Sequence, residues 1–174
     1  IQNTAPTVSN VSVSPSTPSS SDSLTCTYTI FDPDETPSVT VNWTNNTTGL
    51  TLGSVDTLVL SPSMVSVNDS ITCSVTATDG DAANDSASAT VVVGNTAPIM
   101  TTVLISPSNA TNQDNLTCLA TATDADTDPV TYVYTWTNLS TGASLGSGDT
   151  LALDSSISSP TDEIECSAIA SDPN

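Results

Sequence analysis

Carboxylates are the side chains of this sequence with the clearest capacity for chemistry, because they gather in short stretches. "DPDE" begins at Asp32, "DGD" at Asp79 and "DADTD" at Asp124. Clustered carboxylates repel one another unless a hard cation neutralises them, and Ca²⁺ prefers about six to eight oxygen ligands. The alternative is that aspartate simply favours turns and solvated loops. The stretches therefore predict either a calcium site or ordinary polar turns.

Asparagine offers a second kind of chemistry, the attachment of glycans. Nine of the thirteen asparagines stand in N-x-S/T sequons: Asn10, Asn42, Asn45, Asn46, Asn68, Asn84, Asn109, Asn115 and Asn138. Serine and threonine make up about a third of the chain, so chance alone gives roughly four such sequons. The excess predicts covalent glycans, and chance occurrence in a threonine-rich chain is the alternative. Asn45 and Asn46 are adjacent, so we expect only one of them to be used.

The charge of the chain excludes several function classes. It has no Lys, Arg or His and nineteen Asp and Glu, which gives a formal net charge of −19. Such a chain does not bind nucleic acid phosphates or anionic membranes, which both need basic residues, and no apolar run is long enough to insert in a bilayer. Without His, neither Ser-His-Asp nor Cys-His catalysis is available. Glycoside cleavage by paired carboxylates needs an aromatic-lined cleft, and aromatics are 3% of the residues, so we expect no enzyme.

Apolar and polar residues alternate over short segments, as Val39, Val41 and Trp43 illustrate. A period of two predicts strands with one buried face, and no segment has the 3.6-residue period of a helix. Turn residues separate the segments. In the first half of the chain the predicted strands cover residues 8–13, 24–31, 39–44, 50–52, 57–60, 70–78 and 86–93. Many short strands at this spacing predict an all-β sandwich.

The chain contains the same pattern twice. "NTAP" begins at Asn3 and again at Asn95, 92 positions later, and Cys26 and Cys118 have the same offset. Trp43 and Trp136 are 93 positions apart, so the second copy has one inserted residue between Cys and Trp. We therefore predict two domains, residues 1–94 and 95–174.

Each copy places a Trp between two Cys, and this spacing is similar to that of immunoglobulin-like domains. With "NTAP", "DSLTC" and "DNLTC", "VNW" and "YTW", and "SITCSVTATDGD", the chain resembles the tandem immunoglobulin-like and PKD-like repeats of large bacterial and archaeal extracellular surface proteins. It departs from them in lacking the Trp-Asp-Phe-Gly-Asp-Gly signature of PKD domains. Ile71 and Ile164 also replace the Tyr that antibody-type domains have two residues before the second Cys.

The resemblance implies two tandem immunoglobulin-like β-sandwiches, each with a disulfide between strands B and F. These disulfides are Cys26–Cys73 and Cys118–Cys166, and they imply an extracellular or cell-surface location. The alternatives are free buried thiols or a metal site, although zinc is disfavoured because the chain has no CxxC and no His. Closure of such a loop stabilises a domain by about 4 kcal/mol in the chain-entropy model.

The same topology places the loops between strands B and C and between F and G at one end of each sandwich, where the chain also enters. The predicted calcium ligands are Asp32, Asp34, Glu35, Asp79 and Asp81 in the first copy, and Asp124, Asp126, Asp128 and Asp172 in the second, with Asp85, Asn3, Asn95 and Asn174 nearby. The hypothesis is an interdomain calcium clamp like that of cadherin-like arrays.

Families of this kind imply stalks, fibres and adhesins. All predicted loops are short and both copies are alike, so we expect a structural repeat of a glycosylated extracellular filament or stalk, whose partners are further copies of the repeat placed end to end. The alternative is an adhesin, a module that binds carbohydrate or protein through its acidic end. The second copy lacks a counterpart of residues 86–93, the G strand. We expect that strand from the same polypeptide in a longer array or, alternatively, from a neighbouring subunit.

Overall fold

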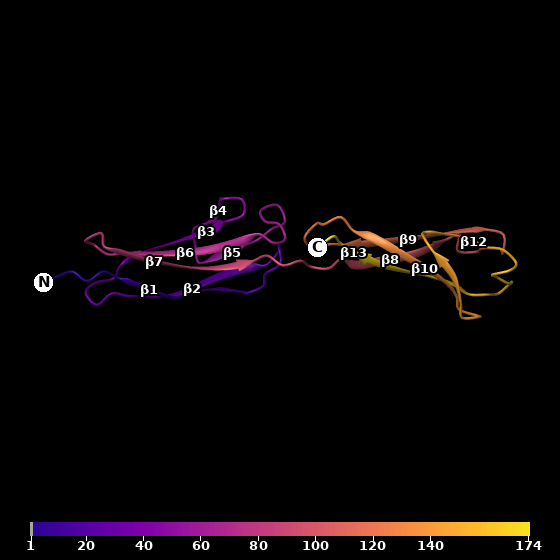
Figure 1. Ribbon diagram of the computed structural model, residues 1–174, viewed down its shortest axis with the longest axis horizontal. Helices are drawn as coiled ribbons and strands as arrows, with labels where there is room; N and C mark the ends of the chain where they lie inside the picture. Colours follow the sequence, from indigo (N-terminus) through magenta and orange to yellow (C-terminus); the bar gives the residue numbers. More distant parts are fainter. Residues whose placement is uncertain (1) are drawn as a thin grey trace. The chain divides into compact units, whose positions relative to one another are not determined.

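The alternating pattern produces two antiparallel sheets in the first half of the chain. The structure, a computed structural model, describes residues 2–174. The strands of the first unit are β1 (Thr7–Ser14), β2 (Ser23–Phe31), β3 (Ser38–Asn45), β4 (Leu50–Gly53), β5 (Thr57–Val59), β6 (Ser70–Thr78) and β7 (Asn84–Val92). One sheet has the order β1-β2-β5 and the other the order β4-β3-β6-β7, and the two form the layers of a β-sandwich (Figure 1). This is the arrangement of strands A, B, E and C, F, G in immunoglobulin-like domains.

The second half of the chain repeats this arrangement with one strand fewer. Its strands are β8 (Ile99–Ser106), β9 (Asn115–Thr123), β10 (Thr131–Asn138), β11 (Ala143–Ser147), β12 (Thr150–Ala152) and β13 (Ile164–Ser171). The sheets have the orders β12-β9-β8 and β11-β10-β13. The chain divides into the units Ile1–Thr96 and Ala97–Asn174, where the sequence analysis placed the boundary after Gly94.

A disulfide joins the two sheets of each unit. Cys26 on β2 bonds Cys73 on β6, and Cys118 on β9 bonds Cys166 on β13. The all-β fold, the two tandem sandwiches and both disulfides confirm the predicted fold class. Disulfides persist in oxidising compartments, so they indicate an extracellular or secreted protein. No helix in residues 2–174 is long and apolar enough to cross a membrane.

A fully buried tryptophan packs in the core beside each disulfide. Trp43 pairs with Cys73 across β3 and β6, and Trp136 pairs with Cys166 across β10 and β13. Each indole N–H donates to a backbone carbonyl, that of Val55 at 2.8 Å or that of Gly148 at 2.9 Å. A buried indole needs such an acceptor, so both cores are built in the same way.

Candidate functional site

The acidic residues of the first unit meet at one end of the sandwich, where they hold three chain segments together. The Glu35 carboxylate, from the β2–β3 loop, accepts a hydrogen bond from Gly80 N–H in the β6–β7 loop at 2.9 Å. Asp34 accepts one from Thr4 N–H in the entry segment at 2.7 Å. Asp79 accepts one from the Asn3 amide at 2.8 Å. The two loops and the entry segment therefore meet as the topology predicts.

Other carboxylate oxygens at this end accept hydrogen bonds from backbone N–H groups, mostly within their own loops. Asp32 Oδ1 accepts from the N–H groups of the second and third residues after it. Asp79 Oδ1 accepts from Asp81 N–H at 3.0 Å and Ala83 N–H at 2.8 Å. Asp85 accepts from Val8 N–H at 2.8 Å and links β7 to β1. These bonds satisfy loop N–H groups that would otherwise lack a partner, which is the structural role that aspartate has in turns.

The second unit repeats part of this arrangement. Asp124 Oδ1 accepts from Asp126 N–H at 2.8 Å and Asp128 N–H at 3.2 Å. Asp128 in turn accepts from the Asn174 amide at 2.7 Å, and Asp172 accepts from Asn174 N–H at 3.0 Å. The β9–β10 loop and the residues after β13 therefore lie together, in the same relation as the equivalent loops of the first unit.

The structure does not assemble these carboxylates into a recognisable metal centre. Within residues 2–174, no group of three or more carboxylate, thiol or imidazole side chains is placed to hold a metal ion. Asp32 Oδ2 and Asp124 Oδ2 are shielded from solvent without a hydrogen-bond partner, but each stands alone in this respect within its loop. Calcium binding stays a prediction of the sequence, and an unchanged melting temperature with and without chelator would contradict it.

Two of the predicted glycan acceptors have a different role. Asn45 and Asn138 are 0% and 1% exposed. The Asn45 amide donates to Asp69 at 2.7 Å, and its Oδ1 accepts from the N–H groups of Thr47 and Thr48. Asn138 donates to Asp162 at 2.7 Å and accepts from the N–H groups of Ser140 and Thr141. A glycan needs this same amide nitrogen in solvent, so the folded protein does not offer either position, and we correct the prediction for these two.

The other seven sequon asparagines are exposed: Asn10, Asn42, Asn46, Asn68, Asn84, Asn109 and Asn115. Asn42 lies on β3 beside the buried Trp43 and points the opposite way, as alternation along a strand requires. At the adjacent pair Asn45 and Asn46, only Asn46 is open to solvent.

The buried asparagines organise the turn that follows β3 or β10, a role the sequence analysis did not assign. Gly49 N–H donates to Asn45 O at 2.7 Å, and Gly142 N–H donates to Asn138 O at 2.8 Å. Both glycines have positive φ, 76° and 75°, which a residue with a side chain adopts only under strain. "NNTTG" and "NLSTG", 93 positions apart, were the sequence signal for this motif.

Asp162 joins this motif to the loop before β13. Its carboxylate accepts from Ser159 N–H at 2.9 Å and from the Asn138 amide at 2.7 Å. The bond from the Ser159 N–H, followed by that from Asn138, holds the pKa of Asp162 below its usual value. Asp69 has the same two kinds of partner, Ser66 N–H and Asn45, in the first unit.

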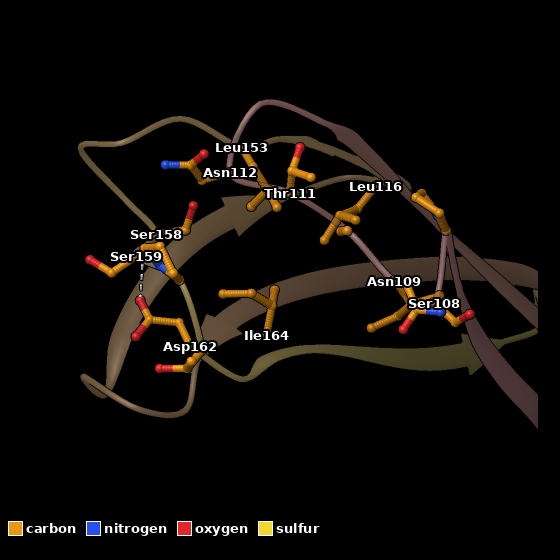
Figure 2. Close-up of a pocket in the computed structure, with 15 residues that line it drawn as sticks. Ser108, Asn109, Thr111, Asn112, Leu116, Leu153, Ser158, Ser159, Asp162 and Ile164 are labelled. Atoms are coloured by element: carbon orange, nitrogen blue, oxygen red, sulfur yellow. Dashed lines mark hydrogen bonds between the residues drawn. The ribbon is translucent and has the colours of Figure 1, made fainter.

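A cavity of about 720 Å³ opens in the second unit beside this motif. Leu116, Leu153 and Ile164 surround it in Figure 2, and Ile105 and Ala110 also line it. Its other walls come from the segments around residues 107–112 and 158–162. These segments lie at the end of β9 opposite the acidic β9–β10 loop, so the cavity is separate from the carboxylates. No motif or spacing in the sequence predicted this cavity.

Comparison with known proteins adds no assignment, since no family model and no curated protein matches the chain.

Proposed function

We propose that the chain is a structural repeat of an extracellular, glycosylated filament or cell-surface stalk. The observation that carries this proposal is the reproduction of one architecture in both units: the disulfide, the buried tryptophan and the asparagine-capped turn recur at matching positions. A spacer needs stiff units of the same kind, whereas a recognition module needs a surface that differs from its neighbours. The loops are short, and hydrogen bonds to their own carboxylates hold them, which supports the view that each unit is stiff.

Surface glycans are part of the proposal. Seven exposed sequons are spread over both units, so a sugar coat would cover a chain whose strands carry many small hydroxyl side chains. Glycans would shield exposed strand edges, which are otherwise prone to pair with other chains.

The test combines imaging with mass mapping of the native material. Electron microscopy should show filaments or stalks with a repeated globular unit. Peptide mapping should find glycans at some of the seven exposed asparagines and none at Asn45 or Asn138. An intact mass equal to that of the bare sequence would refute glycosylation, and native material that is neither filamentous nor surface-attached would refute the spacer. Specific hits on a glycan array would favour the adhesin alternative.

A further inference from the structure

The outermost strand of the first unit shows what a completed sheet requires. β7 pairs with β6 over its whole length, from Ser70 opposite Val92 to Thr78 opposite Asn84. Just beyond the strand, Val93 N–H donates to Asp69 O at 2.9 Å and Val93 O accepts from Asn68 N–H at 2.8 Å. Gly94 N–H then donates to Pro18 O at 2.7 Å.

The side chains of this strand close the core of the first unit. Val91 and Val93 are 7% and 0% exposed, and both belong to the main buried cluster. Ile71, Val75 and Ala77 on the adjacent β6 are fully buried. β7 therefore supplies the last row of backbone hydrogen bonds and the Val91 side chain, and Val93, just after the strand, supplies a second apolar side chain.

The second unit has the partner surface without the strand. Within the described residues, β13 pairs only with β10. Ile164, Ala168 and Ala170, the equivalents of the three buried β6 residues, are all partly exposed. The outer edge of β13 is thus an open row of backbone groups over an incompletely covered core, the situation in which another strand adds to a sheet.

The cavity lies where Val93 stands in the first unit. The groups that bond Val93 and Gly94 belong to Asn68, Asp69 and Pro18, and their equivalents, Thr161, Asp162 and Ala110, all line the cavity. Thr161 even keeps the positive φ of Asn68, 77° against 70°. The apolar floor of Leu116, Leu153 and Ile164 (Figure 2) corresponds to Leu24, Leu60 and Ile71, which are all buried in the first unit.

We propose that the free edge of β13 and this cavity form a docking site for an antiparallel strand with the sequence pattern of β7, the copy being carried by a further repeat of this sequence. Two valines at alternate positions of the added strand fill the cavity and cover Ile164. The glycine that follows them in the added strand lies beside Ala110. Of residues 84–94 only Asp85 is charged, so such a strand adds little like-charge repulsion when it approaches a chain of net charge −19. The proposal rests on the proposed function only for the source of the strand.

The first test uses a synthetic peptide with the sequence of residues 84–94, NDSASATVVVG. We expect it to bind the whole 174-residue chain with one-to-one stoichiometry. It should slow amide exchange in Ile164–Ser171 at those N–H groups that do not bond β10. The control peptide replaces the valines equivalent to Val91 and Val93 with Ser, which leaves the charge of the peptide unchanged. Its dissociation constant should be higher by a factor of about a hundred or more, because each buried valine contributes a factor of about ten or more to the affinity.

The second test attaches the strand covalently and does not depend on peptide affinity. A copy of residues 82–94 is joined directly after Asn174, because the turn there already has the geometry of the first unit: Asn174 N–H bonds Asp172 as Asp81 N–H bonds Asp79. The melting temperature of the second unit should rise, and the same extension with the valines equivalent to Val91 and Val93 replaced by Ser should raise it much less.

Equal binding of the two peptides, or no rise in melting temperature with the extension, would overturn the docking site. Either result leaves the filament proposal standing. Conversely, native material without filaments would refute the spacer without affecting the peptide result.

Discussion

At the scale of single residues, Asn45 and Asn138 have the clearest structural role, because their buried side chains hold loops by hydrogen bonds. The Asn45 side chain bonds three partners, and the Asn138 side chain bonds four, because its amide also donates to Ile157 O. A buried amide with all its bonds satisfied stabilises the fold, whereas removal of one partner leaves buried groups without hydrogen bonds. The same residue type on the outer face of β3, at Asn42, has no such role.

Asn45→Ala should destabilise the first unit by about 2–4 kcal/mol, because Asp69 loses one of its two hydrogen bonds and two turn N–H groups lose their acceptor. Chemical denaturation followed by tryptophan fluorescence measures this difference. Asn42→Ala is the matched control, and as a surface substitution it should change stability by less than about 0.5 kcal/mol. Equal effects of the two substitutions would contradict the role assigned to Asn45.

Asp162 makes the stability of the second unit depend on acid. Its folded-state pKa is lowered by the bonds from Ser159 and Asn138, whereas an unfolded aspartate has a pKa of about 3.9. The bonds therefore stabilise the fold at pH values above about 4, and this contribution is lost as the pH falls through the folded-state pKa.

Asp114 and Asp154 also stabilise the folded second unit above their folded-state pKa values. Hydrogen bonds from the Thr111 N–H, and then from its hydroxyl, lower the pKa of Asp114. Hydrogen bonds from the Ser156 hydroxyl, and then from its N–H, lower the pKa of Asp154.

At pH 7 the second unit of the Asp162→Asn variant should have a lower free energy of unfolding than that of the unaltered chain. At pH 3 the two free energies of unfolding should be nearly equal. Comparing variant and parent at each pH removes the general effect of discharging the other acids. Glu165→Gln, on the exposed face of β13, is the charge-matched control. A difference for Asp162→Asn that grows as the pH falls would show that the sign is wrong.

At the scale of elements, the disulfides carry more weight in the second unit than in the first. Among the residues that the structure describes, the main buried cluster of the first unit contains fourteen and that of the second contains six. A small core buries less apolar surface, so the constraint of a cross-link is a larger part of its stability.

Replacement of Cys118 and Cys166 by Ala should unfold the second unit at a much lower temperature than the same replacement of Cys26 and Cys73 unfolds the first. Each loss is about 4 kcal/mol in the chain-entropy model. Limited thermolysin digestion at increasing temperature, with fragments identified by mass, assigns the unfolding to a unit. First-unit fragments that appear earlier would contradict the difference in core size.

The whole molecule carries nineteen negative side-chain charges and no positive ones. Such a chain repels itself in the compact state, and salt screens that repulsion over about 10 Å at 0.1 M. Raising NaCl from about 10 mM to about 0.5 M should therefore raise both melting temperatures in scanning calorimetry. A fall, or no change, would mean that the acids act chiefly as bonded turn groups.

The strands of the first unit, the repeat and the two disulfides could all be predicted from the order of residues. Alternation defined the strands of the first unit to within one or two residues at most ends. The 92- and 93-residue offsets defined the repeat, and the Cys–Trp–Cys spacing indicated the disulfides. These features are local or periodic, so each can be recognised from the order of residues alone.

Which polar groups face solvent and which are bonded inside depends on how segments far apart in the sequence pack together. Asn45 and Asn46 have the same sequon, yet one is buried and the other exposed, because Asn45 ends β3 and bonds Asp69 from a distant loop, whereas Asn46 lies in the turn that follows the strand. The carboxylates likewise receive N–H groups from separate loops. The lack of a counterpart of residues 86–93 in the second copy could be predicted from the sequence, but the cavity that it leaves depends on how Leu116, Leu153 and Ile164 pack, which is set by segments far apart in the sequence.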